Sequence, residues 1–354
     1  MAGAKGSDEQ RDVYEESEVT LDPLDGRTVA VLGYGNQGRA QALNLRDSGI
    51  EVVIGARAGG RGHGRARDDG FVVLSLPDAA AQGDVVMVLL PDEVQGRAWG
   101  EWLADALRPG AALGFSHGFA VAFGEIAPAD GISCFLVAPK GQGDMLREAY
   151  ARGGGLPGML AVTEGSPDGT WALAAAYAKA IGCLRGGGFR TTFREECVAD
   201  QFGEQAVLCG GLVELVRAAF DTLAARGYSA DNAYFECVHE VKLIADLLHR
   251  HGLDGMRRMI SPTAAYGGLT RGPRLVDDGV RERMGQILDE IESGAFAREF
   301  LAEAARDEPA ALRLARAEAG SGMVSTGRRL RERLDALGLD DPGPGDPHTL
   351  GGDQ

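Results

Sequence analysis

Two pairs of acidic residues are spaced four residues apart in the second half of the chain. Asp200 and Glu204 occur in VADQFGEQAVLCGG, directly before an apolar run, residues 207–209, that is predicted to be buried helix. Glu236 and Glu240 occur in NAYFECVHEVKLIADLL, which is also rich in apolar residues. Residues at i and i+4 share one helix face, and a buried ion carries a large desolvation cost. Each pair must therefore face solvent, be protonated or bind cations.

The third option gives these carboxylates a chemical role, because four negative charges balance two divalent cations. All four side chains offer hard oxygen ligands, which favour Mg²⁺ or Mn²⁺ over zinc. Helical bundles build two-metal sites from acidic pairs on facing helices. A zinc pair of Cys237 and His239 is disfavoured because no matching second pair exists. Two adjacent cations would polarise a carbonyl and acidify a neighbouring hydroxyl, which suggests a hydroxy-keto acid as substrate.

A glycine-rich motif lies near the start of the chain, in VAVLGYGNQGRAQAL. Gly33, Gly35 and Gly38 have the G-x-G-x-x-G spacing, between a predicted strand and a predicted helix. In that context the glycines permit a tight turn, the approach of a pyrophosphate and close helix–strand packing, with the helix N-terminus facing the phosphates. The motif therefore predicts a dinucleotide site, although a purely structural turn would use the same residues.

The residues after the next predicted strand bear on which dinucleotide binds. VVIGARAGGRGHGRA contains no Asp or Glu to hold the ribose hydroxyls of NAD, and Arg57 stands there instead, followed by Arg61 and Arg65. Arginine suits a 2′-phosphate, so NADP(H) is favoured. A solvated basic loop is the alternative interpretation.

Between residues 28 and 182, short apolar runs alternate with helical patterns. The predicted strands are TVAVLG, EVVIGA, VVMVLLP, AALGFS, CFLVAP and GMLAVT. The predicted helices are QGRAQALNLRDSG, closed by Gly49, and DGTWALAAAYAKAIG, with Asp168 as N-cap and Gly182 at its end. This alternation predicts an α/β fold with a doubly wound parallel sheet. Residues 195–320 show long helical periodicity, which predicts an all-α second part.

Composition excludes several classes of partner. The chain has 354 residues and a net charge of −16, which argues against nucleic acid and anionic membranes. No apolar run is long enough to span a bilayer, and the polar start MAGAKGSDEQRD does not resemble a signal peptide. The five cysteines are unclustered and lie in apolar contexts, which indicates reduced, buried thiols in a cytoplasmic protein: Cys134, Cys183, Cys197, Cys209 and Cys237.

These patterns divide the chain into two domains with polar ends. Residues 13–190 are predicted to form a Rossmann-like NADP-binding domain, and residues 191–337 a helical domain that holds the metals and the substrate. Residues 1–12 and 338–354 are polar, and the second of these segments is rich in Gly, Pro and Asp, so both are predicted to be disordered.

The chain resembles ketol-acid reductoisomerases (acetohydroxy-acid isomeroreductases) of the short, class I kind, from about Val13 to Leu337. The resemblance is carried, in chain order, by VAVLGYGNQG, ALNLRDSG, LLPDEVQ, SHGF, APKGQG, GGGLP, AYAKAIG, DQFGEQAVLCGG, AYFECVHEVKLIADL, MRRMIS and TRGPR. It implies Mg²⁺-dependent alkyl migration in a 2-hydroxy-2-alkyl-3-keto acid. NADPH reduction to a 2,3-dihydroxy acid follows, as a step of branched-chain amino-acid biosynthesis.

The resemblance also implies site residues. The metal ligands of the family fall on the four carboxylates Asp200, Glu204, Glu236 and Glu240, and its substrate-contacting serine falls on Ser261. Glu240 or Lys140 is implied as the proton carrier, and His117 as the residue that organises the cofactor side. Family contacts to the cofactor fall on a larger set: Gly33, Tyr34, Gly35, Asn36, Gln37, Gly38, Arg57, Asp92, Glu93, Val94, Gln95 and Gly143.

The family's architecture implies a knotted helical domain and a homodimer or higher oligomer. The active site would then be shared, with Glu236, Glu240 and Ser261 of the partner subunit completing it. Several positions depart from the usual family pattern: Arg39, Gln41, Gly60, Gly62, Ala120, Gln142, Asp144, Gln201, Pro262 and Ala265. Two alternatives therefore stay open. The chain could be a diverged reductase that acts on another small keto acid or ketone, or a non-catalytic nucleotide-binding protein.

Overall fold

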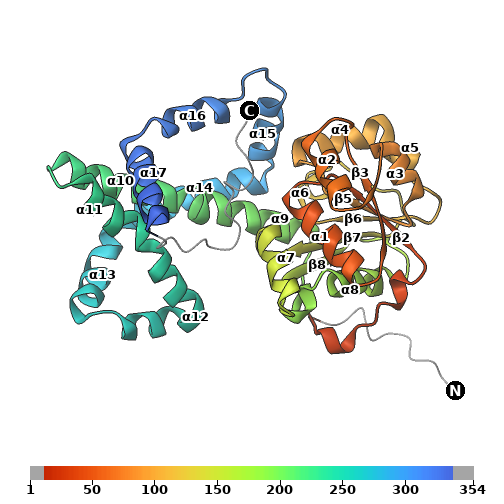
Figure 1. The fold of residues 1–354 in the computed structure, drawn as a ribbon, viewed down its shortest axis with the longest axis horizontal. Helices are drawn as coiled ribbons and strands as arrows, with labels where there is room; N and C mark the ends of the chain where they lie inside the picture. Colours follow the sequence, from red (N-terminus) through yellow and green to blue (C-terminus); the bar gives the residue numbers. More distant parts are fainter. Residues whose placement is uncertain (1–11, 338–354) are drawn as a thin grey trace. The chain divides into compact units, whose positions relative to one another are not determined.

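The computed structural model describes residues 12–337, which divide into two compact units within α9 (Phe193–Phe202). We call residues 12–197 the sheet unit and residues 198–337 the helical unit (Figure 1). The predicted disordered segments fall on residues 1–11 and 338–354, outside the described residues, except for Asp12. None of the helices within residues 12–337 combines the length and the apolar character needed to cross a bilayer.

The sheet unit is built on nine strands in the order β1-β9-β8-β7-β6-β5-β2-β3-β4. The strands are β1 (Val13–Tyr14), β2 (Thr28–Leu32), β3 (Glu51–Gly55), β4 (Val72–Leu74), β5 (Val85–Val88), β6 (Ala112–Phe115), β7 (Cys134–Pro139), β8 (Gly158–Val162) and β9 (Gly188–Arg190). The six predicted strands are all present. The additional strands β1, β4 and β9 have only two or three residues each, too few to show a pattern in the sequence.

The predicted doubly wound sheet is present and its central strands are parallel, but two pairs differ from the prediction, because β8 runs antiparallel to β7 and β1 runs antiparallel to β9. The first reversal follows from how α7 (Gly143–Ala151) is anchored. The Gln37 side chain on α1 (Asn36–Asp47) donates to the Gly141 carbonyl, with 2.9 Å between Nε2 and O. Gly143 also packs against the Asn36 backbone so closely that a Cβ would collide with it. The chain therefore stays at the carboxyl edge of the sheet after β7, and β8 starts back from that edge.

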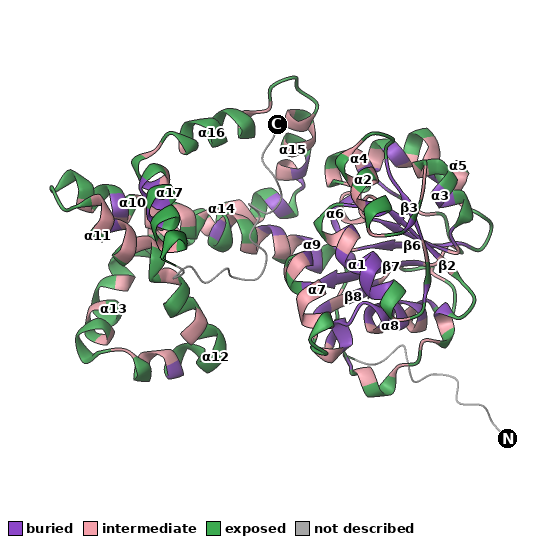
Figure 2. Cartoon of the chain, viewed as in Figure 1, coloured by how far each residue is buried: buried purple, intermediate pink, exposed green. Residues whose placement is uncertain are grey.

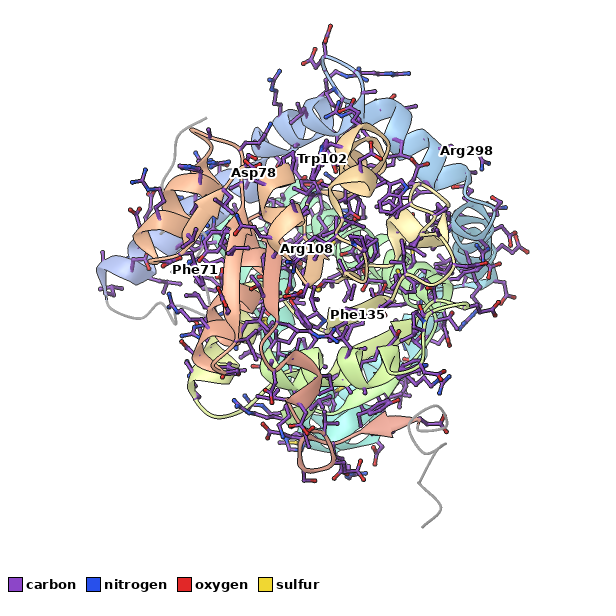
Figure 3. The ribbon with its side chains drawn as sticks, turned by 90° about the vertical axis from the view of Figure 1, so that its right-hand side faces the viewer. Phe71, Asp78, Trp102, Arg108, Phe135 and Arg298 are labelled. Carbon is purple, nitrogen blue, oxygen red and sulfur yellow. The ribbon has the colours of Figure 1, made fainter. Side chains whose placement is uncertain are left out.

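Helices cover both faces of this sheet. The remaining helices of the sheet unit are η1 (Glu16–Glu18), η2 (Asp22–Leu24), α2 (Arg61–Asp68), α3 (Leu76–Gln82), α4 (Asp92–Ala98), η3 (Trp99–Leu103), α5 (Ala104–Ala106), α6 (Phe119–Ala122), α8 (Thr170–Ala180) and η4 (Cys183–Arg185). Alternate residues of a strand point to opposite faces. Accordingly, Val29 and Val31 of β2 join the core under α1 and α8, while Ala30 and Leu32 join the core under α3. Figure 3 shows the side chains of this interior, with Phe135 among them.

One predicted helix start is wrong. α8 begins at Thr170, and its N-cap is Gly169, which has φ +89° and makes no side-chain cap hydrogen bond, so Asp168 is not the cap. A positive φ is readily adopted by glycine, which has no Cβ, and this lets the chain turn into the helix there. The predicted end of α8 is correct, because Gly182 follows the helix with φ +90°.

The helical unit is all-α, as predicted. Its helices are η5 (Gly203–Leu208), α10 (Gly211–Ala225), α11 (Ala230–Tyr234), η6 (Phe235–His239), α12 (Val241–Met259), α13 (Pro262–Leu275), α14 (Asp278–Glu292), α15 (Ala295–Ala304), α16 (Ala310–Ala319) and α17 (Gly322–Ala336). Its buried core is small and centres on Phe220, Ala233 and Met323, which join α10, α11 and α17.

Many apolar side chains of the helical unit are exposed in the single chain, and Figure 2 shows few buried residues along its helices. The prediction that residues 207–209 are buried is wrong here: Val207 is 50% and Leu208 60% exposed, and Cys209 is exposed as well. Cys237 is only partly buried. The physical reason is that no element within residues 12–337 covers this side of the segment, so its apolar residues stay exposed.

Candidate active site

A cavity of about 940 Å³ opens at the carboxyl ends of the central strands of the sheet unit. Its lining comes from the segments that follow β3, β2, β5 and β6, which are neighbours in the sheet. Strand order reverses between β2 and β5, and ligands of doubly wound sheets bind at such a switch point. The predicted catalytic His117 lines this cavity, together with nine of the predicted cofactor residues: Gly33, Tyr34, Gly35, Gln37, Arg57, Asp92, Glu93, Val94 and Gln95.

The glycine-rich turn crosses the middle of this cavity. Gly33 has φ +99°, and a Cβ there would collide with the Leu89 backbone. A Cβ on Gly38 would collide with the Gly33 carbonyl, so this glycine lets α1 pack closely on β2. Gly35 is different, because a Cβ on it would meet no atom of residues 12–337 within 4 Å. Packing within these residues thus gives no reason for glycine at position 35, whereas a phosphate that approaches the backbone does.

The cavity has a basic end over β3. Arg57, Arg61 and Arg65 all line it, and α2 starts there with Gly60 as an N-cap that makes no side-chain hydrogen bond. Helix N-termini carry unpaired N–H groups and favour anions. The guanidinium groups and the uncapped helix end together form a suitable environment for a phosphate group.

The opposite end lies over β5 and β6 and carries charged groups of both signs, Asp92, Glu93 and Arg97 among them, beside the uncharged Gln95. Gln95 is 4% exposed, and its Nε2 donates to the Leu90 carbonyl at 2.8 Å. Within residues 12–337, its Oε1 is buried without a hydrogen-bond partner. Buried polar atoms are normally hydrogen-bonded, so this oxygen is placed to accept a hydrogen bond from a ligand in the cavity. The cavity therefore fits a dinucleotide by its glycine turn, its basic end and this acceptor.

Glu196 is a site residue that the sequence interpretation missed. Its side chain on α9 is 1% exposed. Its Oε1 accepts from Lys140 Nζ at 2.9 Å, and its Oε2 accepts from the Gly118 backbone N–H at 2.9 Å. His117 Nδ1 lies 3.4 Å from Oε2. The predicted catalytic residues His117 and Lys140, from different loops, are thus brought to one buried carboxylate. Asp200 lies one turn further along α9.

The electrostatics of this cluster keep its members charged. Burial by itself lowers the pKa of His117, but hydrogen bonds to Cys197 and Glu196 and the charges of Glu196 and Asp92 outweigh it and raise this pKa to about 11. Burial by itself raises the pKa of Glu196, but His117 and Lys140 outweigh it and hold this pKa below its ordinary value. The cluster is therefore a buried carboxylate between two cationic groups.

The predicted metal ligands lie in or next to π-helical turns, which the sequence did not predict. Asp200 lies in α9 and Glu204 in the π-helix η5, while Glu236 lies in the π-helix η6 and Glu240 between η6 and α12. Backbone bonds from residue i+5 to residue i mark both sites: Cys209 N donates to Glu204 O, and Glu240 N donates to Phe235 O. π-Helical turns are rare and often occur at functional sites. The i, i+4 spacing predicted a regular α-helix and gave no sign of them.

The single chain does not gather the predicted ligands. Among residues 12–337, no three of the four carboxylates come together in one cluster. Glu236 and Glu240 are exposed. Ser261, the predicted substrate residue, is also exposed and caps α13, with its Oγ accepting from Ala264 N at 3.1 Å.

The remaining predicted residues lie beside the cavity, at the contact of α1 with α7. Asn36 begins α1, and its Nδ2 donates to Asp144 Oδ2 at 3.1 Å in the first turn of α7. Gly143 packs on Asn36. Gln142 is the N-cap of α7 but makes no side-chain cap hydrogen bond. Two of the positions that depart from the family pattern, Gln142 and Asp144, are thus located at a helix–helix contact next to the glycine-rich turn.

Comparison with known proteins assigns both parts of the chain. Residues 23–187 match the family model described as acetohydroxy acid isomeroreductase, NADPH-binding domain. Residues 193–336 match the model described as ketol-acid reductoisomerase, C-terminal domain.

Similarity to solved structures supports these two family matches. An NADH-preferring ketol-acid reductoisomerase from an uncultured archean is 40% identical over 91% of this chain and 99% of its own, with a TM-score of 0.87. A semialdehyde dehydrogenase NAD-binding protein from Cupriavidus necator is 22% identical over 75% of this chain and 99% of its own, with a TM-score of 0.58. The second likeness concerns the fold alone.

Proposed function

The chain belongs to the family of ketol-acid reductoisomerases, nucleotide-dependent enzymes that are both isomerases and oxidoreductases, and we propose that it acts on acetohydroxy acids with NADPH and two Mg²⁺ ions. The reaction is an alkyl migration in a 2-hydroxy-2-alkyl-3-keto acid of the acetolactate class, followed by reduction to a 2,3-dihydroxy acid. Residues 13–190 serve as the cofactor domain and residues 191–337 as the metal and substrate domain.

NADPH is favoured over NADH by the basic end of the cavity. Arg57, Arg61 and Arg65 line it, and the uncapped N-terminus of α2 opens onto it. Arginine binds phosphate oxygens in a fork geometry. Gly60 and Gly62 offer no hydroxyl there, so the grip on a 2′-phosphate depends on charge and on backbone N–H groups.

Asp200, Glu204, Glu236 and Glu240 are the proposed Mg²⁺ ligands, because all four offer hard oxygen donors. Bound Mg²⁺ would polarise the substrate carbonyl and acidify its hydroxyl. Glu196 holds Lys140 and His117 in place through the contacts described above. We assign proton transfer to Lys140 or Glu240, the organisation of the cofactor side to His117, and substrate contact to Ser261.

The site is proposed to be shared between two chains. Two observations support this: the four ligands do not gather within one chain, and α12 and α13 carry exposed apolar residues that a second copy would cover. These residues are Leu243, Ile244, Leu248, Leu253, Met259, Tyr266, Leu269 and Leu275. In this arrangement Glu236 of the partner subunit, Glu240 of the partner subunit and Ser261 of the partner subunit complete each site, in a homodimer or higher oligomer.

The observation that carries the proposal is the joint match of both domains to one family, together with the glycine-rich cavity in the first of them. The test is an assay of 2-acetolactate with NADPH and with NADH, each with and without Mg²⁺. We expect oxidation of NADPH that requires both Mg²⁺ and acetolactate. Turnover of simple 2-keto acids without acetolactate turnover would instead identify the diverged reductase.

Subunit complementation tests the shared site. Glu204→Gln and Glu240→Gln are each expected to abolish turnover, while the exposed Glu282→Gln serves as a neutral control. Randomly mixed Glu204→Gln and Glu240→Gln subunits would form hybrid dimers with one intact site of two, which restores about a quarter of the activity in a two-fold symmetric assembly. Mixing Glu236→Gln with Glu240→Gln leaves no intact site.

Equal activity in the two mixtures would contradict the shared site. Unchanged Mg²⁺ affinity in Glu236→Gln would favour the alternative of a non-catalytic nucleotide-binding protein.

A further inference from the structure

A stripe of polar side chains runs along one face of α1 inside the sheet unit. Gln37, Gln41, Asn44 and Ser48 are spaced at i, i+4, i+7 and i+11, which places them on one helix face. Gln41 and Asn44 are 0% exposed, although buried polar groups are costly unless every one of them is hydrogen-bonded. The partners of each member therefore show what the stripe does.

Gln41 is the centre of a hydrogen-bond chain whose direction is fixed. Its Oε1 accepts from Tyr177 Oη at 2.7 Å, and its Nε2 donates to Ser116 Oγ at 2.8 Å and to Gln37 Oε1 at 3.1 Å. A carbonyl oxygen only accepts, so the Tyr177 phenol must donate. Burial raises the Tyr177 pKa well above its ordinary value, which keeps that proton in place. The amide nitrogen of Gln41 is consequently turned toward Ser116.

Ser116 directly follows β6, lines the cavity and is partly exposed to it. A hydroxyl has one hydrogen to donate and two lone pairs that accept. Gln41 donates to the Ser116 oxygen, so one lone pair is used within the protein. No acceptor among the described residues takes the hydroxyl hydrogen, which is left for a ligand. The Ser116 hydroxyl is therefore a hydrogen-bond donor toward the cavity, and the fully buried amide of Gln41 fixes the position of its oxygen.

The position of Ser116 in the sheet identifies the part of the ligand it would meet. The cavity runs from the end of β3, past β2 and β5, to the end of β6. The arginines that suit the adenosine 2′-phosphate lie at the β3 end, and the pyrophosphate belongs at the glycine-rich turn after β2. The remaining half of the dinucleotide, which carries the nicotinamide, must then extend over β5 and β6.

We propose that Ser116 donates a hydrogen bond to the nicotinamide half of the cofactor, and that Gln41 is the positioning residue that fixes its hydroxyl. The inference rests on the proposed placement of the cofactor.

The far end of the stripe has a different role: Asn44 donates to the Ile181 carbonyl at 2.9 Å and Ser48 to the Ala180 carbonyl at 2.7 Å, so these two residues attach α1 to α8. Ser48 lies outside the cavity lining and provides a matched control.

The test compares two probes that share the adenosine half. Ser116→Ala, Ser116→Thr and Ser48→Ala are titrated with NADPH and with 2′,5′-ADP, which lacks the nicotinamide half. We expect Ser116→Ala to weaken NADPH binding about ten-fold, the loss of one good hydrogen bond, and to leave 2′,5′-ADP binding unchanged. Ser116→Thr keeps the hydroxyl and should restore most of the NADPH affinity, while Ser48→Ala should change neither probe.

The positioning role of Gln41 is tested by coupling. Gln41→Met with Tyr177→Phe removes the amide without leaving a buried phenol unpaired, and should weaken NADPH selectively, as Ser116→Ala does. Adding Ser116→Ala to that variant should cause little further loss, because both changes remove one interaction. Fully additive losses would overturn the role of Gln41.

Two results decide the remaining claims. Equal weakening of both probes by Ser116→Ala, or no weakening of NADPH, would overturn the assignment of Ser116, and this variant decides the question even if the Gln41 variant does not fold. A wild-type protein that binds neither probe would overturn the proposed cofactor site and this inference with it.

Discussion

The sheet unit and the helical unit bury their apolar residues very differently. In the sheet unit the strands are covered on both faces, and the two cores contain most of the fully buried large side chains, such as Phe115, Phe135 and Tyr177. In the helical unit the core centres on three buried residues, and long apolar faces of α12 and α13 are exposed. The difference supports the proposed assembly, in which the sheet unit is stable by itself and a second copy covers the apolar surface of the helical unit.

Separating the units tests this comparison most severely. Residues 1–197 expressed alone should unfold cooperatively on heating and bind NADPH, because the cavity lies entirely within them. Residues 198–341 alone at low concentration should show no cooperative transition by circular dichroism. A helical fragment that unfolds cooperatively as a monomer would contradict the comparison.

Glu196→Gln tests the buried cluster of the sheet unit next to the boundary with the helical unit. The change leaves Lys140 and His117 beside a neutral amide, and removing one partner of a buried ion pair typically costs about 3–5 kcal/mol of stability. We expect a loss near the lower value, measured by urea denaturation, together with a large loss of turnover. Glu195→Gln is the control, because Glu195 is exposed. Equal effects of the two changes would show that the cluster has no special role.

Asp69→Asn changes a network confined to the sheet unit. Asp69 accepts from Tyr34 Oη at 2.8 Å and from Arg39 Nε at 2.7 Å. The Arg39 hydrogen bond is the largest favourable influence and lowers the pKa of Asp69 from its ordinary 3.8. The ionised Asp69 thus contributes its full stabilisation above pH 3.8. This stabilisation is lost as the pH falls through the pKa of Asp69 in the folded protein, which is lower than 3.8.

We expect Asp69→Asn to lose about 1 kcal/mol at pH 7, since the pair is partly exposed to solvent, and to approach the wild type in stability below pH 3.8. The loss should not depend on protein concentration, because no second chain is involved. The neighbouring exposed Asp68→Asn is the control. If the stability difference between Asp69→Asn and the wild type grew as the pH fell, this prediction would be contradicted.

Gly60→Ser is the smallest change and affects only the basic end of the cavity. Gly60 caps α2 with φ −75°, which serine adopts readily, and a Cβ there would meet the Arg57 carbonyl at 3.2 Å, a tight but adjustable contact. The added hydroxyl should lower the KM for NADPH roughly three-fold, the effect of a hydrogen bond at the weak end of the usual range. The KM for NADH should not change, and a parallel change in both would argue against a 2′-phosphate at this end.

Features that depend on neighbouring residues could be recognised in the sequence. The glycine spacing, the six longer strands and the all-α second part are local patterns, and each is present in the structure. Glu196 was not predicted as a site residue, although it lies four residues before Asp200, the same spacing that separates Asp200 from Glu204. Its partners Gly118 and Lys140 are 78 and 56 residues away, and no local pattern shows contacts of that range.

The sequence by itself determined the dinucleotide turn and the residue types of the carboxylate pairs, because turn geometry and helical spacing depend only on adjacent residues. Tertiary structure alone decided the reversal of β8 and the direction of the Gln41 amide toward Ser116. These two features depend on how α1 meets α7 and α8 and on which buried groups find partners. Such contacts exist only after segments far apart in the chain have packed together.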